Sequence, residues 1–281
     1  MPNNTRSISG MRHATHILAV VLVTIGMAGC AARQAANPSP TLAPDKAASS
    51  LAGRERLLTS LQTPAIMDYS GPSGHLKARE QLIVRRPASL RVDAMSPLGV
   101  ALIVAADDAQ IAVFNPSSNT LMRGAASAAT LARFTQIPMA PAQAVRLLLG
   151  LAPDNSILAA TPSSSRTEGE MRVLSYAGAG AGDYEFGFSS GQLALVRARD
   201  AAGQVTYEVY YSDYRDIGPM KFPFEIEARF FANATAIKFH YLNPLIDRQI
   251  PDSTFVLSPG PGTRLIELGF AAPSTLRAGP G

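Results

Sequence analysis

Few side chains in this sequence have the types and spacing that catalysis or metal binding requires. His75 and His240 lie on separate predicted strands, and neither has a cysteine, histidine or carboxylate partner at metal-ligand spacing. The glycine-rich run 177–182 lacks the lysine and serine or threonine of a phosphate loop, and a strand follows it instead of a helix. We therefore expect no metal ligands and no bound cofactor, and we interpret the glycine run as a hairpin loop.

Two acidic pairs are the remaining candidates for acid–base chemistry. Asp107-Asp108 and Asp213/Asp216 fall in predicted turns, where short carboxylates cap backbone groups. A pair of glycosidase-like carboxylates is the alternative interpretation. Because the nucleophile sequence G-x-S-x-G is also absent, we predict that the protein is not an enzyme.

Cys30 is the only cysteine and the one residue with a distinct predicted chemistry. It follows a basic N-terminus, the apolar stretch 17–25 and the small residues Ala28 and Gly29, which together indicate a secretory signal over residues 1–29. The apolar stretch is too short to cross a membrane as a stable helix. The arrangement resembles the bacterial lipobox, which implies an N-acyl diacylglycerol on Cys30. An ordinary signal peptide followed by an unmodified cysteine is the alternative.

The charge balance argues against a nucleic-acid partner. Removal of residues 1–29 takes away two arginines and no acids, so the formal charge falls from +4 to +2. The remaining basic residues are scattered, which gives no electrostatic footprint for a polynucleotide. With 47% hydrophobic residues, the chain has enough apolar surface for one sizeable core.

The chain divides into a signal, a tether, one domain and a tail. Residues 30–46 are rich in alanine, proline and serine and predict a flexible tether. A domain then extends over 47–270, and 271–281 is predicted to be a disordered tail. Within the domain, a helical pattern begins near Asp45, a possible N-cap, and we expect it to stop at Pro64.

A period of two, typical of half-buried strands, occupies most of the remaining chain. It predicts strands at 76–85, 90–94, 100–106, 110–115, 171–176, 184–188, 193–199, 205–211, 222–230 and 236–242. The stretch 100–106 is apolar at every position, so we expect both of its faces to be covered. Helical spacing returns only at 126–134 and 141–149.

These patterns predict a mainly β protein with a few helices. We expect a strongly curved antiparallel half-barrel of about 10–11 strands, with a concave apolar face that about three helices cover. Such a sheet either encloses an apolar cavity or packs solidly against its helices, and alternation does not distinguish the two. The candidate cavity residues are Leu82, Leu102, Val104, Phe222, Phe224, Ile226, Phe239 and Tyr241.

A proline-leucine-glycine turn, Pro97-Leu98-Gly99, separates two of the predicted strands. Leu98 stands at the tip of this turn, where an aliphatic side chain is exposed unless it folds back under the sheet edge. The sequence leaves these two placements equally open.

Three segments resemble the LolA/LolB superfamily of periplasmic lipoprotein carriers and outer-membrane lipoprotein receptors. They are the strands around Arg86-Pro87-Ala-Ser-Leu90-Arg91, the turn Ser96-Pro97-Leu98-Gly99, and the helical insert Ile137-Pro-Met-Ala-Pro-Ala-Gln-Ala-Val-Arg-Leu-Leu-Leu-Gly150. The pattern is nearest to the receptor branch, as a divergent member. The tryptophan usual in the receptor's insert is absent, since the chain has none.

The resemblance implies a lipid-anchored, monomeric outer-membrane lipoprotein whose domain faces the periplasm. It would take acyl chains of lipoproteins into an apolar cavity, receive them from a LolA-like carrier, and use Leu98 as the membrane-facing element. Cys30 would supply the anchor. Two alternatives stay open: a lipid or glycolipid carrier in envelope assembly with the same cavity, and a solidly packed structural envelope lipoprotein.

Overall fold

The computed structural model describes residues 44–178 and 182–268. The predicted signal peptide, Cys30, the tether up to residue 43 and the predicted tail lie outside these residues, as does the middle of the glycine run 177–182. The first described helix begins at Pro44, so the last three residues of the predicted tether are helical.

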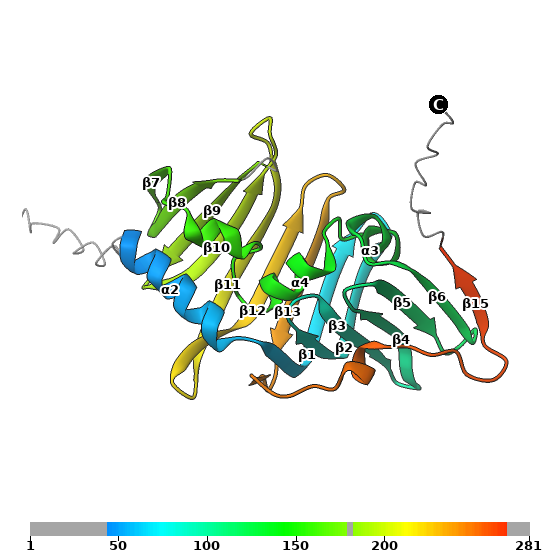
Figure 1. The fold of residues 1–281 in the computed structure, drawn as a ribbon. Helices are drawn as coiled ribbons and strands as arrows, with labels where there is room; N and C mark the ends of the chain where they lie inside the picture. The colour runs from blue at the N-terminus through cyan, green and yellow to red at the C-terminus, as the bar shows by residue number, and fades with distance from the viewer. Residues whose placement is uncertain (1–43, 179–181, 269–281) are drawn as a thin grey trace, which may run out of the picture. The chain divides into compact units, whose positions relative to one another are not determined.

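The described helices and strands alternate with short connections (Figure 1). The helices are α2 (Pro44–Leu57), α3 (Ala128–Thr135) and α4 (Pro141–Leu148), with 3₁₀ turns η1 (Asn155–Ala159) and η2 (Asp252–Phe255). The first strands are β1 (Ser60–Gly71), β2 (Gly74–Arg85), β3 (Ser89–Ser96), β4 (Gly99–Ala106), β5 (Gln110–Asn115), β6 (Thr120–Ala125), β7 (Ser164–Glu168) and β8 (Met171–Ala177). The later strands are β9 (Asp183–Ser189), β10 (Gln192–Arg199), β11 (Val205–Ile217), β12 (Met220–Phe230), β13 (Thr235–Tyr241), β14 (Leu245–Ile246) and β15 (Arg264–Glu267).

All of these strands form one open, curved sheet, which confirms the predicted fold class. Strands β1–β6 and β7–β13 are two antiparallel meanders, and β1 joins them by pairing with β13 from Ala65↔Tyr241 to Ser70↔Ala236. The sheet does not close, because β7 and β15 are its two edges. It has fifteen strands among the described residues, compared with the 10–11 expected.

Five observed strands are missing from the prediction, namely β1, β6, β7, β14 and β15, and the last three of these lack a usable alternation of apolar residues. β7 (Ser-Ser-Arg-Thr-Glu) contains no apolar side chain, and β14 and β15 have only two and four residues. Such segments join a sheet through backbone hydrogen bonds to a neighbour that already exists. The β15 segment pairs in parallel with β6, which no local pattern could indicate.

The first helix ends earlier than the sequence suggested. It stops at Leu57, and Pro64 lies inside β1, so the expectation of Pro64 as the helix stop is wrong. Proline is tolerated there because Pro64 falls between the residues of β1 that pair with β14 and those that pair with β13, where a missing N–H removes no ladder bond.

The end of α2 is fixed to α4 by two charged side chains. Glu55 accepts hydrogen bonds from Arg146 of α4 at 2.6 and 2.9 Å, and it also pairs with Arg86. The buried Arg54 donates to the carbonyl oxygens of Gly150 (3.2 Å) and Lys221 (2.8 Å). These contacts hold α2 and α4 on the same face of the sheet (Figure 1).

Two tyrosines of the sheet hold the C-terminal end of α4. The hydroxyl groups of Tyr211 and Tyr241 donate to the carbonyl oxygens of Leu147 and Leu148, each at 3.1 Å. Carbonyl groups of the last helical turn have no partner within the helix. The tyrosines therefore satisfy them and fix the height of α4 above the concave face.

The outer face of the sheet is polar and densely ion-paired. Arg197 contacts Glu185 (2.8 Å), Glu208 (2.6 Å) and Glu168 (3.1 Å), and Arg166 contacts Glu185 at 2.9 Å. We refer to these five residues as the outer-face network. At the other meander, η2 covers part of the outer face, where Arg85 lies 5.0 Å from the ring centre of Phe255.

The expectation that β4 is covered on both faces along its whole length is wrong. Val104, Ala105 and Ala106 are buried, but Val100 and Ala101 are exposed. The first residues of β4 lie next to the exposed β3–β4 turn, so their apolar character does not reflect burial.

Candidate ligand-binding cavity

An apolar cavity of about 310 Å³ lies between the concave face of the sheet and helices α3 and α4. Its walls come from β1–β4, from β11–β13, and from the segment 131–148. Of its 26 lining residues, only Tyr69, Ser73, Glu80, Thr135 and Gln136 are polar. The size and lining match those of pockets for small apolar ligands.

Five of the predicted cavity residues line this space. They are Leu82, Leu102, Val104, Ile226 and Phe239. Their strands bring them together although nearly 160 residues separate the first from the last, because the β1–β13 pairing joins the two meanders. Of the two packing modes that the sequence left open, a cavity is therefore present in this part of the sheet.

The other three predicted residues do not line the cavity. Phe222 and Tyr241 are fully buried, but their rings stack 6.2 Å apart and fill the core next to the cavity. Phe224 is also buried, and its ring lies 4.4 Å from the guanidinium carbon of Arg215. Alternation identified these side chains as buried, but their position along the strand places them beyond the end of the hollow region.

Sequence reasoning missed the helical wall of the cavity. Leu131, Phe134, Ile137, Met139, Leu147 and Leu148 all line it. The helices themselves were expected, and the observed ends of α3 and α4 lie within two residues of the predicted ones. Their apolar stripes were the available signal, but a stripe does not indicate whether it faces a filled core or a hollow one.

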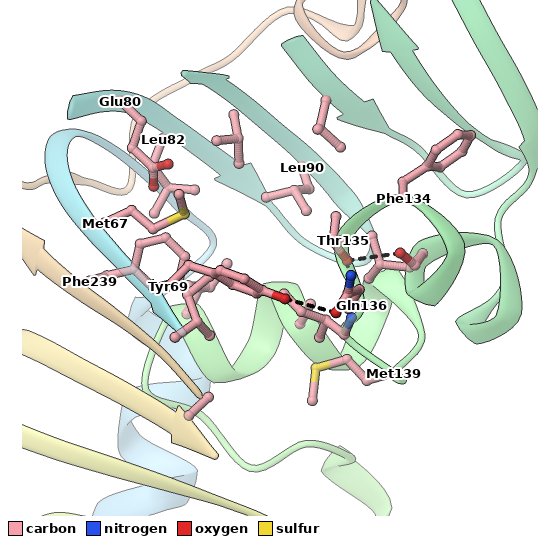
Figure 2. Close-up of a pocket in the computed structure, with 18 of the residues that line it drawn as sticks. Met67, Tyr69, Glu80, Leu82, Leu90, Phe134, Thr135, Gln136, Met139 and Phe239 are labelled. Carbon is pink, nitrogen blue, oxygen red and sulfur yellow. Dashed lines mark hydrogen bonds between the residues drawn. The ribbon is translucent and has the colours of Figure 1, made fainter. Parts of the chain in front are cut away.

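Hydrogen bonds tie the α3–α4 connection to the sheet. Figure 2 shows Tyr69 of β1 reaching Gln136, whose Oε1 accepts the Tyr69 hydroxyl at 2.9 Å. The Gln136 carbonyl oxygen accepts from Asn233 Nδ2 at 2.7 Å. Gln136 itself has φ 61°, so the chain turns sharply at the end of α3. One short segment thus closes the cavity between β1 and the β12–β13 turn.

Glu80 is the unexpected residue of the site. It lies on β2 in phase with Leu82 and Val84, and it is 3% exposed. Both of its carboxyl oxygens are buried without a hydrogen-bond partner among the described residues. Burial raises the pKa of this carboxyl group to about 8, so most of it is protonated at neutral pH. An acid within an apolar alternation was the sequence signal.

Exposed apolar side chains gather at the end of the sheet where the cavity meets solvent. The cavity-lining Leu76 is 53% exposed, and Leu98 at the tip of the β3–β4 turn is 100% exposed. The β1–β2, β3–β4 and β12–β13 turns share this end, because the strands alternate in direction and Ser70 pairs with Ala236. We call Leu76, Met95, Leu98, Val100 and Phe231 the exposed rim.

The exposure of the turn 97–99 distinguishes between the two placements that the sequence left open. Pro97, Leu98 and Gly99 are all exposed, and Leu98 does not fold back under the sheet edge. Gly99 has φ 114°, a conformation that favours glycine. The turn is stabilised locally by the Ser96 hydroxyl, which accepts from the Leu98 N–H at 3.2 Å and donates to the Gly99 carbonyl oxygen.

The described residues offer neither a metal site nor a membrane-spanning helix. Across 44–178 and 182–268, no group of three or more histidine, cysteine, aspartate or glutamate side chains could hold a metal ion. No helix in that part of the chain is long and apolar enough to span a membrane. His75 and His240 lie on different strands, and the Nδ1 atom of His75 lies 3.5 Å from Oδ1 of Asp68.

Known proteins resemble this chain in structure but not detectably in sequence. No model of a protein family matches it, and no curated protein matches it in a sequence search. Among solved structures, a LolA superfamily protein from Nitrosomonas europaea has a TM-score of 0.52 at 15% identity, over 75% of this chain and 97% of that one. The fold is LolA-like.

Two further structures agree with this assignment of the fold. An outer membrane lipoprotein-sorting protein domain from Vibrio parahaemolyticus has a TM-score of 0.52 at 8% identity, and a DUF1329 family protein from Desulfovibrio piger has 0.54 at 10%. Each match covers 75% of this chain and 94% of the other. The LolA-like fold is thus retained although few residues are shared.

Proposed function

We propose that this protein is a non-enzymatic lipoprotein of the outer membrane that accepts acyl chains of lipoproteins and assists their insertion in the membrane. One observation carries the proposal. An apolar cavity meets solvent at the same end of the sheet as a rim of exposed apolar side chains. Exposed apolar side chains that gather at one end of a protein are typical of contact sites for membranes or partners.

The energetics of transfer follow from burial of the alkyl chain. Each CH₂ group moved from water into the cavity contributes about 0.8 kcal/mol, and the bilayer offers the same gain per group. The chain can therefore leave the cavity for the membrane without a large net cost. Contact between the rim and the bilayer would spare the alkyl chain from crossing water.

We further propose that Cys30 carries the lipid anchor and that the protein acts as a receptor, supplied by a LolA-like carrier. The sequence before Cys30 and the turn around Leu98 support this choice within the LolA-like fold. A protein fixed to its membrane by a tether receives cargo there and does not shuttle.

The test is transfer of a fluorescent triacylated lipopeptide from the purified, lipidated protein to liposomes. We expect Leu98→Glu to bind the lipopeptide normally but to transfer it at least tenfold more slowly, because a charge at the rim resists entry into the bilayer. Leu57→Glu is the matched control: Leu57 is 52% exposed at the end of α2, adjacent to the start of β1 and away from the rim.

Three results would contradict parts of the proposal. If the wild-type protein takes up no lipopeptide, the cavity does not serve acyl chains. Normal transfer by Leu98→Glu would remove the role of the turn. If the protein takes up a glycolipid but no lipopeptide, the alternative of a glycolipid carrier in envelope assembly is favoured.

A further inference from the structure

Glu80 occupies a position where the sheet otherwise places apolar residues. Along β2, Leu82 and Val84 share its face and are fully buried. Across the sheet, its register partners are Ala65 on β1 and Ala94 on β3. The side chain therefore stands mainly among small and aliphatic neighbours at the cavity shown in Figure 2, with the phenol of Tyr241, two strands away on β13, near enough to interact with it electrostatically.

The carboxyl group has no structural partner that explains it. Neither oxygen receives a hydrogen bond among residues 44–178 and 182–268, and no lysine, arginine or histidine described there lies within ion-pair distance of it. A buried acid without partners destabilises the fold, and a leucine at this position would not. Its presence is explained more directly by a ligand than by the fold.

The protonation state determines which ligand atoms suit Glu80. Because burial raises the pKa of Glu80 to about 8, the group is mainly a neutral acid at pH 7. A neutral carboxyl group has one O–H donor and retains acceptor capacity. In an apolar cavity, the least costly partner is an uncharged oxygen, since a charged one would itself lose its hydration.

We propose that Glu80 is the polar anchor of the cavity and donates a hydrogen bond to the ester or amide carbonyl oxygen of a bound acyl lipid. This inference rests on the proposed function, because it assumes that the cavity takes an acyl chain. Glu80 lies six residues from the first residue of β2, roughly 20 Å at the rise of a strand. The linkage that carries the carbonyl would therefore enter the cavity along with the alkyl chain.

Access to the anchor requires a small rearrangement. The carboxyl oxygens are covered in the structure, and Met67 lies diagonally across from Glu80, since Ala65 and Ala78 are the register partners of Glu80 and Met67. Met67 also lines the cavity. Methionine is unbranched and adapts to irregular space, so its displacement would open the path to the carboxyl group.

The proposal is tested with two probes of equal length, pyrenyl-dodecane and the methyl ester of pyrenyl-dodecanoic acid. Fluorescence titration of the full mature protein gives the Kd of each. We expect the wild type to bind the ester more tightly and Glu80→Leu to weaken ester binding about 3- to 10-fold, as for the loss of one hydrogen bond, without weakening hydrocarbon binding. Glu80→Gln keeps an N–H donor and should retain ester affinity within about twofold.

The outcomes separate this inference from the proposed function. If neither probe binds the wild type, the proposed function fails. If both bind and Glu80→Leu leaves the ester preference unchanged, only the anchor role is wrong. A glutamine variant that loses ester binding as the leucine variant does would overturn the donor role. Melting temperatures of all variants, with Leu102→Met as a cavity-wall control, verify that each one folds.

A second set of titrations identifies the source of the carbonyl. A triacylated lipopeptide and phosphatidylglycerol both carry acyl esters, and each is titrated into the wild type and Glu80→Leu. The lipid whose affinity falls more in the variant is the one whose linkage reaches Glu80. If each lipid binds the wild type and Glu80→Leu with the same affinity, the result contradicts the proposal.

Discussion

The concave face of this sheet is packed in one region and hollow in another. In the packed region, the rings of Tyr176 and Phe186 are arranged edge to face, with their centres 5.4 Å apart, and the ring of Phe222 stacks on that of Tyr241. All four side chains are fully buried. We call these four residues the aromatic core. In the hollow region, mainly aliphatic side chains of β1–β4, of β11–β13 and of the α3–α4 segment surround the cavity.

The difference shows that alternation and packing are separate properties. Both regions have apolar side chains at every second position, and both are covered by helices. Large rings fill the space under the helices in one region, while in the other a mainly aliphatic lining, with the rings of Tyr69, Phe134, Phe230 and Phe239 in its walls, leaves the space open. Protein interiors otherwise pack as densely as organic crystals, so a persistent hollow indicates a binding role.

The largest expected effect compares the two regions by truncation. Phe186→Ala in the aromatic core should lower the free energy of unfolding by about 3–5 kcal/mol, because it creates a cavity in a filled core. Leu102→Ala only enlarges an existing hollow and should cost less than half as much. Urea unfolding of the purified protein measures both, and equal losses would contradict the contrast.

A second prediction uses pH and the Glu80 carboxyl group. Its folded pKa of about 8 exceeds the ordinary value of 4.5, so the folded state binds more protons between these values and stability falls as pH rises through this window. A leucine at this position binds no proton and has no such dependence. Glu80→Leu should therefore stabilise the protein increasingly from pH 5 to pH 8, as measured by thermal unfolding. A stability difference that does not grow over this range would mean that the carboxyl group is hydrated in solution.

Glu185 in the outer-face network should show the opposite dependence. Burial alone would raise the pKa of Glu185, but hydrogen bonds from Arg166 and Arg197 outweigh it and hold the pKa at about 2. Its stabilisation is present above the unfolded pKa and is lost as pH falls toward 2. Glu185→Gln should thus destabilise the protein at pH 7, with a difference from wild type that shrinks on acidification. A constant difference would contradict the assignment.

A fourth prediction concerns added volume. Ala198→Leu, in the buried part of β10, should cost about 1–3 kcal/mol because the filled region has no space for it. Ala94 lines the cavity, so the larger side chain of Ala94→Leu would occupy empty space and should change the free energy of unfolding by less than about 0.5 kcal/mol. The same substitution should weaken the binding of an acyl probe. If Ala94→Leu is as costly as Ala198→Leu, the cavity is not open in solution.

The smallest expected effect concerns how the helices are held over both regions. Gly150 follows α4 with φ 67°, and a Cβ there would lie 2.8 Å from Arg54 Nη2. Gly150→Ala should therefore cost about 1–2 kcal/mol. Gly53→Ala, in α2 with no atom within 4 Å of the new Cβ, should instead stabilise by about 0.5–1 kcal/mol. Thermal melts compare the two.

The sequence predicted most of the long elements, because their patterns extend over many residues, but it missed the twelve-residue β1, whose first residues it assigned to the end of the first helix. The predicted strand 110–115 matches β5, and 141–149 matches α4 to within one residue. It could not predict β7 or β15, whose pairing depends on neighbours distant in the chain. Of the candidate cavity residues, five line the cavity, whereas Phe222, Phe224 and Tyr241 lie outside it.

The sequence by itself determined the curved β architecture, the apolar faces, the exposed-turn candidate at Leu98 and the expectation of a lipid anchor at Cys30. Tertiary structure alone decided where the apolar face is hollow, that Leu98 is fully exposed, and that Glu80 is buried without a partner among the described residues. The physical reason is that the two properties depend on contacts of different range along the chain. Periodicity reports which face a residue takes, whereas free volume depends on side chains from strands and helices that only the folded chain brings together.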